Sequence, residues 1–365
     1  MKRGLFINNS RAQDSIYESG VMVFNCLRLS KEYQLDYLEV DADHRLVPRG
    51  YDFYFFNYHP STMAWMDTAQ LKKLKGMLLT MVLEVLPDDP FVFVPDRHFH
   101  GYCVLDPTVR LRNPRVFAFP RPLEKAADLP PYVEKEVPVI GSFGFATKGK
   151  GFQHVVDAVN KEFDRAIIRI NIPFGNFVPD SESYSGFLSK LCRDRAKEGI
   201  EVVVTHDYMS KEELIRWCSQ NTLNCFLYDR NLPGLAATTD QAIVTGRPLA
   251  VSANETFRHI LAYLTPYQQW SLKRSIEESA ELVKRMQEDW SPETFARKFE
   301  EVLFKLSKTS DIRNESTEQF EIPLFRNTFW QKVQRRYRKY KRMLTLRKLR
   351  RLIFSGLHLK NEELT

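Results

Sequence analysis

The segment GSFGFATKGKGFQHVVDAV, residues 141–159, carries the pattern that decides the fold. An apolar run of strand length enters a loop with three glycines, and a helix-like stretch follows directly. Strands that alternate with helices in this way are typical of α/β proteins with parallel sheets. We therefore expect a buried strand over 137–143 and a helix over 152–160.

The loop between them has the composition of a phosphate-binding loop. Glycines let the backbone approach a ligand closely, the free amides of a helix start favour anions, and lysines add positive charge. The spacing matches neither Walker A nor G-x-G-x-x-G, so an ordinary turn remains an equal alternative for this loop alone. The candidate residues are Gly144, Thr147, Lys148, Lys150 and Gly151.

A second segment, CFLYDRNLPGLAATTDQAIVTGRPLAVS at 225–252, has a similar layout. A strand ends at Tyr228, a loop runs to Ala237, and a helix opens near Thr238 with free N–H groups at its start. Gly246-Arg247-Pro248 ends that helix. Taken alone, this pattern favours a turn, a cap and a helix stop without a ligand.

Together these segments resemble the C-terminal domain of GT-B glycosyltransferases, most closely the family-4 type, across 137–303. In that family a strand ends in Gly, a Lys-Gly pair follows, and an Ala lies seven residues beyond. Gly144, Lys150, Gly151 and Ala158 match this spacing.

Two further signatures of the family follow in order. Its strand, short loop and Ser-x-Glu-Glu-Leu helix are matched by VVVTHDYMSKEEL at 202–214, where Ser210 and Glu213 also form a predicted capping box. Its Glu-Ala-x-x-x-Gly-x-Pro is matched by Gln241-Ala242, Gly246 and Pro248.

The resemblance implies a nucleotide-sugar as co-substrate, no other cofactor and no bound metal ion. It also implies retention of the anomeric configuration, with amides and lysines stabilising the departing diphosphate. The implied donor-binding residues are Gly144, Thr147, Lys148, Lys150, Gly151, Tyr208, Asp229, Arg230, Gly234, Leu235, Ala236, Thr238, Thr239 and Gln241.

The chain departs from the family at three positions. The Glu-x7-Glu pair would fall on Pro233 and Gln241, so neither carboxylate is present, although Asp240 is adjacent to the second position. Phe145 stands where the family has Arg after the loop glycine. These changes affect how the nucleotide ribose is held and raise the alternative of an inactive protein.

The N-terminal half alternates strands and helices in the same way, with strands expected over 4–7, 35–40, 52–56, 78–83, 91–94 and 116–119 and a helix over 19–30. His59 and Glu84 follow strand ends, where α/β proteins collect functional groups. We therefore take His59, Glu84 and Asp240 as candidate catalytic residues. His98 and His100 lack a third ligand that would specify a metal.

The expected fold is α/β and GT-B, with two tandem Rossmann-like domains that face a cleft. An N-terminal acceptor domain covers 1–133, a nucleotide-sugar donor domain covers 134–308, and a linker with a basic amphipathic helical tail covers 309–365. A proline-rich stretch around 123–136 marks the first boundary.

Composition supports a globular chain of 365 residues and 42.8 kDa, with 43% hydrophobic and 13% aromatic residues. Five scattered cysteines argue against a disulfide framework or a zinc site and fit a reducing compartment. No signal-peptide core and no apolar run long enough to span a membrane occurs. A cytoplasmic location is expected.

The formal charge of +7 is unevenly distributed. Twelve basic residues and no acidic ones lie between Lys332 and Lys360. Without these twelve charges the rest of the chain has a formal net charge of −5. The stretch 329–360 therefore predicts a basic amphipathic helix that binds an anionic membrane at its inner face. Nucleic acid and the acidic body of the protein are alternative partners, although the acidic balance elsewhere argues against nucleic acid.

Three functions remain open from the sequence. The first is a glycosyltransferase acting on a glycan, lipid-linked or polysaccharide acceptor. The second is a non-catalytic GT-B scaffold or sugar-nucleotide sensor, because the carboxylate pair is missing. The third is a nucleic-acid-associated protein that uses the basic tail.

Overall fold

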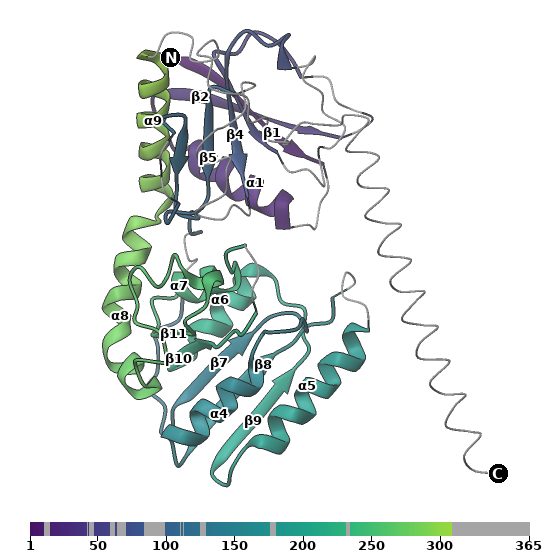
Figure 1. Cartoon of the computed structure of the whole chain (residues 1–365), viewed down its shortest axis with the longest axis vertical. Coiled ribbons are helices and arrows are strands. Elements are labelled where there is room, and N and C mark those ends of the chain that lie inside the picture. The colour runs from purple at the N-terminus through teal and green to yellow at the C-terminus, as the bar shows by residue number, and fades with distance from the viewer. Residues whose placement is uncertain are drawn as a thin grey trace, which may run out of the picture.

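The computed structural model contains two parallel β-sheets, one in each of two lobes (Figure 1). The first sheet is built from the N-terminal part of the chain and the second from the part that follows residue 138. The structure describes residues 1–10, 15–41, 43, 47–58, 63, 71–83, 99–109, 111, 113–124, 129–175, 180–230 and 234–308.

The first sheet has six strands in the order β2-β1-β3-β4-β5-β6, and all neighbouring strands are parallel. Helix α1 (Ser15–Leu27) connects β1 to β2. The strands are β1 (Lys2–Asn9), β2 (Tyr33–Val40), β3 (Phe53–Asn57), β4 (Met77–Val82), β5 (Gly101–Val104) and β6 (Val116–Ala118).

The second sheet has five parallel strands in the order β11-β10-β7-β8-β9. Its strands are β7 (Val139–Phe143), β8 (Ala166–Asn171), β9 (Ile200–Thr205), β10 (Leu223–Phe226) and β11 (Leu249–Val251). The connecting helices are α4 (Phe152–Glu162), α5 (Ser181–Arg195), α6 (Lys211–Ser219) and α7 (Thr238–Val244). The structure confirms the predicted capping box of Ser210 and Glu213 at the start of α6.

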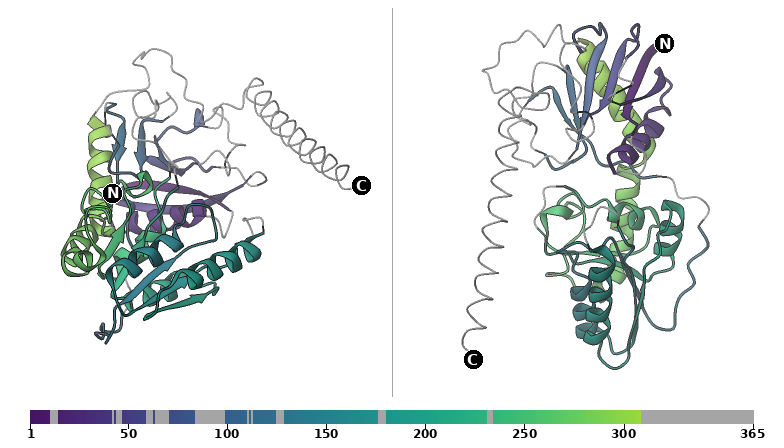
Figure 2. Two further views of the ribbon diagram at one scale, coloured as in Figure 1. Left: turned by 60° about the horizontal axis from the view of Figure 1, so that its bottom comes forward. Right: turned by 90° about the vertical axis from the view of Figure 1, so that its right-hand side faces the viewer.

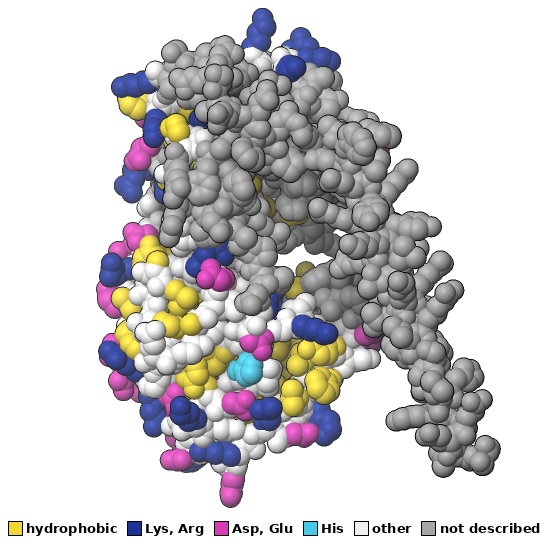
Figure 3. All heavy atoms as spheres, in the orientation of Figure 1, with side chains coloured by type: hydrophobic (Ala, Val, Ile, Leu, Met, Phe, Trp, Pro, Cys, Tyr) yellow, Lys and Arg dark blue, Asp and Glu magenta, His cyan; other side chains and the backbone are white. Residues whose placement is uncertain are grey.

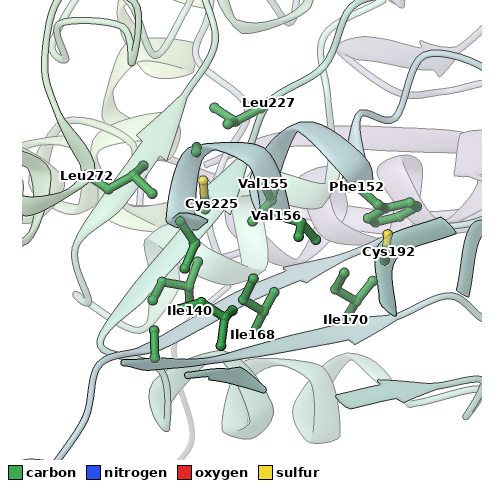
Figure 4. Close-up of a cluster of buried hydrophobic side chains, with 14 of the residues drawn as sticks. Ile140, Phe152, Val155, Val156, Ile168, Ile170, Cys192, Cys225, Leu227 and Leu272 are labelled. Atoms are coloured by element: carbon green, nitrogen blue, oxygen red, sulfur yellow. The ribbon is translucent and has the colours of Figure 1, made fainter. Parts of the chain in front are cut away.

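Each sheet has a hydrophobic core on both of its sides. In the second lobe, α4 presents Phe152, Val155 and Val156 to Ile168 and Ile170 of strand β8 (Figure 4). The five cysteines are buried and free. Burial raises the pKa of the Cys26 thiol to about 12, which keeps it protonated and unreactive.

Helices α8 (Leu272–Asp289) and α9 (Pro292–Lys308) run along one side of both lobes (Figures 1 and 2). The apolar side of α9, which includes Phe295 and Phe299, packs into the core of the first sheet beside Phe55. The chain therefore returns from the second lobe to cover the first one. The sequence pattern indicated the start of α9 at Ser291-Pro292 but not this destination.

Several local features differ from the sequence expectations. Strand β5 and helix α8 were not predicted, and the strand expected over 91–94 lies outside the described residues. β5 is only four residues long, and burial of all four leaves no alternating pattern to read.

No helix in the described part of the chain is both long and apolar enough to span a bilayer.

Candidate functional site

The two glycine-containing segments of the sequence meet at one point of the second sheet. The strand order reverses between β7 and β10, which are neighbours in the sheet although three helices and two strands separate them along the chain. Ligands of open α/β sheets bind outside the carboxyl ends of the strands at such a reversal. The loops that leave β7 and β10 form the candidate site.

Glycines bring these loops into direct contact. Gly149 and Gly151 have φ values of 78° and 67°, a region that side chains with a Cβ rarely adopt. A Cβ on Gly149 would lie 2.5 Å from the Cβ of Arg230, and one on Gly151 would collide with the Leu227 carbonyl. The Asp229 amide donates to the Gly149 carbonyl at 3.1 Å. Close backbone approach therefore requires glycine at both positions.

Lys150 occupies the centre of this contact. Its side chain is buried, and its Nζ donates to the Tyr228 hydroxyl at 2.8 Å. The same hydroxyl lies 2.8 Å from Thr238 Oγ1 at the start of α7. Among the described residues Lys150 forms no ion pair with a carboxylate. A buried ammonium without a counter-charge is costly, so its position indicates an anionic ligand.

Arg230 brings a second cation to the same tyrosine. Its guanidinium carbon lies 5.2 Å from the centre of the Tyr228 ring, while Lys150 Nζ lies 4.5 Å from that centre. Arg230 Nε and Thr147 Oγ1 are buried and have no hydrogen-bond partner in the described part of the chain. Arg230 also forms no ion pair among the residues described by the structure. Two cations thus lie against one ring.

The nearby carboxylates are already engaged. Asp229 Oδ2 lies 3.0 Å from His154 Nε2 in the first turn of α4. Asp240 lies in the first turn of α7, and its Oδ2 accepts a hydrogen bond of 2.8 Å from Arg121 Nε. Burial raises the pKa of the Asp240 carboxyl, and the positive charge of Arg121 opposes that rise. These pairs leave the positive charges of Lys150 and Arg230 uncompensated.

The remaining predicted residues lie around this centre or outside the described part of the chain. Lys148 and Tyr208 are exposed, and Thr239 is buried and donates to the Ala236 carbonyl at 2.8 Å. Partly buried positions are Gly234, Leu235 and Gln241. His59 and Glu84 lie outside the described residues, so the structure does not place them.

Ion pairs connect the carboxyl ends of the two sheets. Arg258, which follows β11, holds Asp106, which follows β5, with an Nη2–Oδ2 distance of 2.6 Å. The two side chains are only 10% and 3% exposed. Arg121, which follows β6, reaches Asp240 in the same way. The carboxyl end of the first sheet is therefore held opposite the candidate site.

Sequence reasoning missed four residues of this arrangement, namely Tyr228, Asp106, Arg121 and Arg258. Tyr228 carried a usable signal, because it is the last residue of the predicted strand in the second segment. Asp106 and Arg258 had none, since 152 residues separate them along the chain.

Comparison with known proteins supports the fold. No family model matches the sequence, and no curated protein sequence matches it. Among solved structures, the chain is similar to Anabaena HepE in complex with UDP-glucose, at 10% identity and a TM-score of 0.54 over 83% of this chain and 100% of that one. It is also similar to the lipopolysaccharide outer core galactosyltransferase WaaB, at 10% identity and a TM-score of 0.57 over 83% of this chain and 99% of that one. The chain is similar to OtsA in its apo form with the same identity and TM-score, over 85% of this chain and 100% of that one. The chain has the GT-B fold of these structures.

Proposed function

We propose that the protein is a glycosyltransferase that moves a sugar from a nucleotide-sugar donor to an acceptor. The observation that carries this proposal is the buried Lys150 ammonium, which has Arg230 beside it and no carboxylate among its described neighbours. A nucleoside diphosphate supplies two negative charges at this point. The UDP-glucose in the HepE structure is a ligand of this class in a protein of the same fold.

The two cations would act mainly on the leaving group. Cleavage of the bond between the sugar and the phosphate proceeds through an oxocarbenium-like state, and negative charge grows on the departing diphosphate. Cations that are already in place stabilise this charge without reorganisation. Phe145 stands where the family has an arginine and carries no charge. Arg230 would supply that positive charge instead. Retention of configuration and metal-independent chemistry, which the resemblance implies, belong to this proposal.

The proposed donor site comprises the two loops and the start of α7. Gln241 would hydrogen-bond a hydroxyl where the family has a carboxylate. The roles of His59, Glu84 and Asp240 as catalytic residues stay predictions. Of these, the Asp240 carboxylate is already paired with Arg121, so a catalytic role requires that pair to open.

For the acceptor we propose a glycan, either lipid-linked or part of a polysaccharide, at the cytosolic face of a membrane. The support is the basic stretch 329–360, which would hold the enzyme close to an anionic surface. The boundaries of the acceptor domain, donor domain and tail at 133/134 and 308/309 are part of the same proposal.

The first test is a thermal-shift screen with UDP-, GDP-, ADP- and dTDP-sugars, without added metal. Wild-type protein should be stabilised by one of these nucleotides, and a Lys150→Met variant should lose that stabilisation. Lys161→Met, which removes an exposed lysine from α4, is the matched control and should respond like wild type. A folded wild-type protein that responds to none of the donors would contradict the proposal.

A second candidate function is a sugar-nucleotide sensor or scaffold without catalysis. It is favoured by the missing carboxylate pair and by the engagement of Asp240 with Arg121. The two functions differ in turnover. A transferase hydrolyses or transfers the sugar of the donor that stabilises it, whereas a sensor binds that donor and leaves it intact.

A further inference from the structure

Exposed cations gather at the amino ends of the strands of the first sheet. Parallel strands start at one edge, and the register pairs Lys2 with Tyr33 and Phe53 with Met77. The segments that lead into β1, β2, β3 and β4 therefore lie side by side. We name this edge, with the last turn of α9, the cationic pole; its exposed basic residues are Lys2, Arg3, Arg28, Lys31, Arg49, Lys72, Lys73, Lys75, Lys305 and Lys308.

Few acidic side chains balance these charges. Arg3 pairs with Asp36 at 3.0 Å, and the Asp52 carboxylate accepts the Arg3 backbone amide. Glu32 is the other exposed acid along these strand starts within the described residues. In Figure 3 dark blue side chains are visible at the top of the molecule. The cationic pole therefore carries a large net positive charge.

Exposed apolar side chains accompany the cations. The last turn of α9 lies at this edge, because Leu306 packs over the position of Gly101 at the start of β5. On the outer side of that turn the Phe304 side chain is 60% exposed, and Lys308 Nζ lies 4.1 Å from its ring centre. Leu29, just after α1, is 46% exposed. Phenylalanine and leucine among lysines are typical of surfaces that enter the headgroup region of a bilayer.

The corresponding edge of the second sheet has a different character. Cations at the starts of its strands are matched by acids, as in the pairs Arg165–Glu136 at 3.8 Å and Lys197–Asp164 at 3.6 Å. Mixed charge is ordinary for a solvated surface. Within the described residues, the excess of basic over acidic side chains is thus a property of the first lobe rather than of both lobes.

We propose that the cationic pole is a membrane-binding surface for anionic phospholipids. The basic stretch 332–360 and the cationic pole of a second copy are both repelled by its charge, so neither suits it as an occupant. The chain leaves α9 at Lys308, within the pole, and twelve further basic residues follow between 332 and 360. Pole and tail therefore act on the same lipid surface. This proposal concerns the folded body and does not depend on the glycosyltransferase assignment.

The test compares two full-length variants that each lose four exposed lysines. The pole variant carries Lys72→Gln, Lys73→Gln, Lys75→Gln and Lys308→Gln. Its matched control carries Lys161→Gln, Lys190→Gln, Lys197→Gln and Lys284→Gln, all on the second lobe. Co-sedimentation is measured with vesicles of phosphatidylcholine alone and of phosphatidylcholine mixed in equal parts with phosphatidylglycerol.

The pole variant should bind the anionic vesicles at least about tenfold more weakly than the control variant, since each cation near such a surface contributes about 1 kcal/mol. Neither variant should bind the neutral vesicles. Melting temperatures of the two variants should agree, because all eight lysines are exposed. Equal binding of both variants to the anionic vesicles would overturn the proposal.

A Phe304→Ser variant separates lipid from nucleic acid as the partner. Loss of an exposed apolar side chain should weaken binding to anionic vesicles several-fold and leave binding to a DNA duplex unchanged. The pole variant is measured with the same DNA duplex. If it loses DNA binding and keeps vesicle binding, the cationic pole is a nucleic-acid surface and the lipid proposal is refuted.

Discussion

Two sets of buried or partly buried cations lie at the carboxyl ends of the sheets and differ in their partners. Arg121 and Arg258 each hold a carboxylate, Asp240 and Asp106 respectively, and so join the two sheets. Lys150 and Arg230 lie against one tyrosine ring and hold none among the described residues. The first set is compensated within the protein, and we propose that the second set binds an anionic ligand, since a charge removed from water must be compensated. Whether a cation has a carboxylate partner, rather than how deeply it is buried, distinguishes a structural cation from a candidate ligand-binding one here.

Breaking a satisfied pair should have the largest effect. Asp106→Ala leaves Arg258 buried without its carboxylate and should lower the free energy of unfolding by about 3–5 kcal/mol. Chemical denaturation of the purified variant measures this loss. The double variant Asp106→Ala/Arg258→Met removes both charges and should recover much of it. A single variant as stable as wild type would show that the pair is not a structural link.

Removing an uncompensated cation should affect binding instead of stability. Lys150→Met gives up one charged hydrogen bond to the ligand, worth about 1.5–3 kcal/mol, or about a 10- to 100-fold weaker Kd for the stabilising nucleotide. Titration calorimetry measures the Kd, with Lys161→Met as control. The variant's unfolding free energy should stay close to that of wild type. A loss of stability as large as that of Asp106→Ala would place Lys150 in the structural set.

His259 extends the comparison to a base without any partner. Both ring nitrogens are buried and make no hydrogen bond, and the ring stacks on Trp290 at 5.5 Å. Burial lowers the pKa of His259 from 6.5 to about 3, with Arg121 and Arg258 adding to that effect. The unfolded chain thus binds a proton below pH 6.5 that the folded chain does not. The stability contributed by this residue is complete above pH 6.5 and is lost as the pH falls toward 3.

A His259→Phe variant removes this pH dependence. Between pH 7 and pH 5 wild type should lose about 2 kcal/mol more of its unfolding free energy than the variant does. Denaturation curves at the two pH values give the difference. Parallel losses in both proteins would mean that His259 is protonated in the folded state or hydrogen-bonded there.

The smallest effect is expected at Tyr228, which positions the lysine without carrying charge. Tyr228→Phe removes the hydroxyl that links Lys150 Nζ to Thr238 and keeps the ring. Binding of the nucleotide should weaken by about 1 kcal/mol, roughly fivefold. Thr245→Val, which removes a hydroxyl from the far end of α7, is the control and should bind like wild type. An effect at Tyr228 as large as that of Lys150→Met would indicate direct contact with the ligand.

Much of the fold could be predicted because its pattern is local. The strand–loop–helix units of the second lobe have clear periodicity, and the boundaries of β7 and α4 agree with expectation within about two residues. The composition of the loop around Lys150 and Gly151 predicted a phosphate site, with an ordinary turn as an equal alternative, and the phosphate site stays a prediction. β5 was missed because a short, fully buried strand has no alternating pattern. α8 was missed although it has readable local signals, namely a Ser271 cap and buried residues that recur at helical spacing.

The amino-acid sequence alone specified the order of strands and helices, the glycine loop and the basic C-terminal stretch, because these depend on neighbours within a few residues. Tertiary structure decided which charges meet. Asp240 pairs with Arg121 across 119 residues, Arg258 with Asp106 across 152, and α9 returns to the first sheet. Contacts between distant segments depend on how the two sheets pack and not on local pattern. Only the folded structure therefore distinguishes the cations that pair with carboxylates from the cations that we propose as ligand-binding residues.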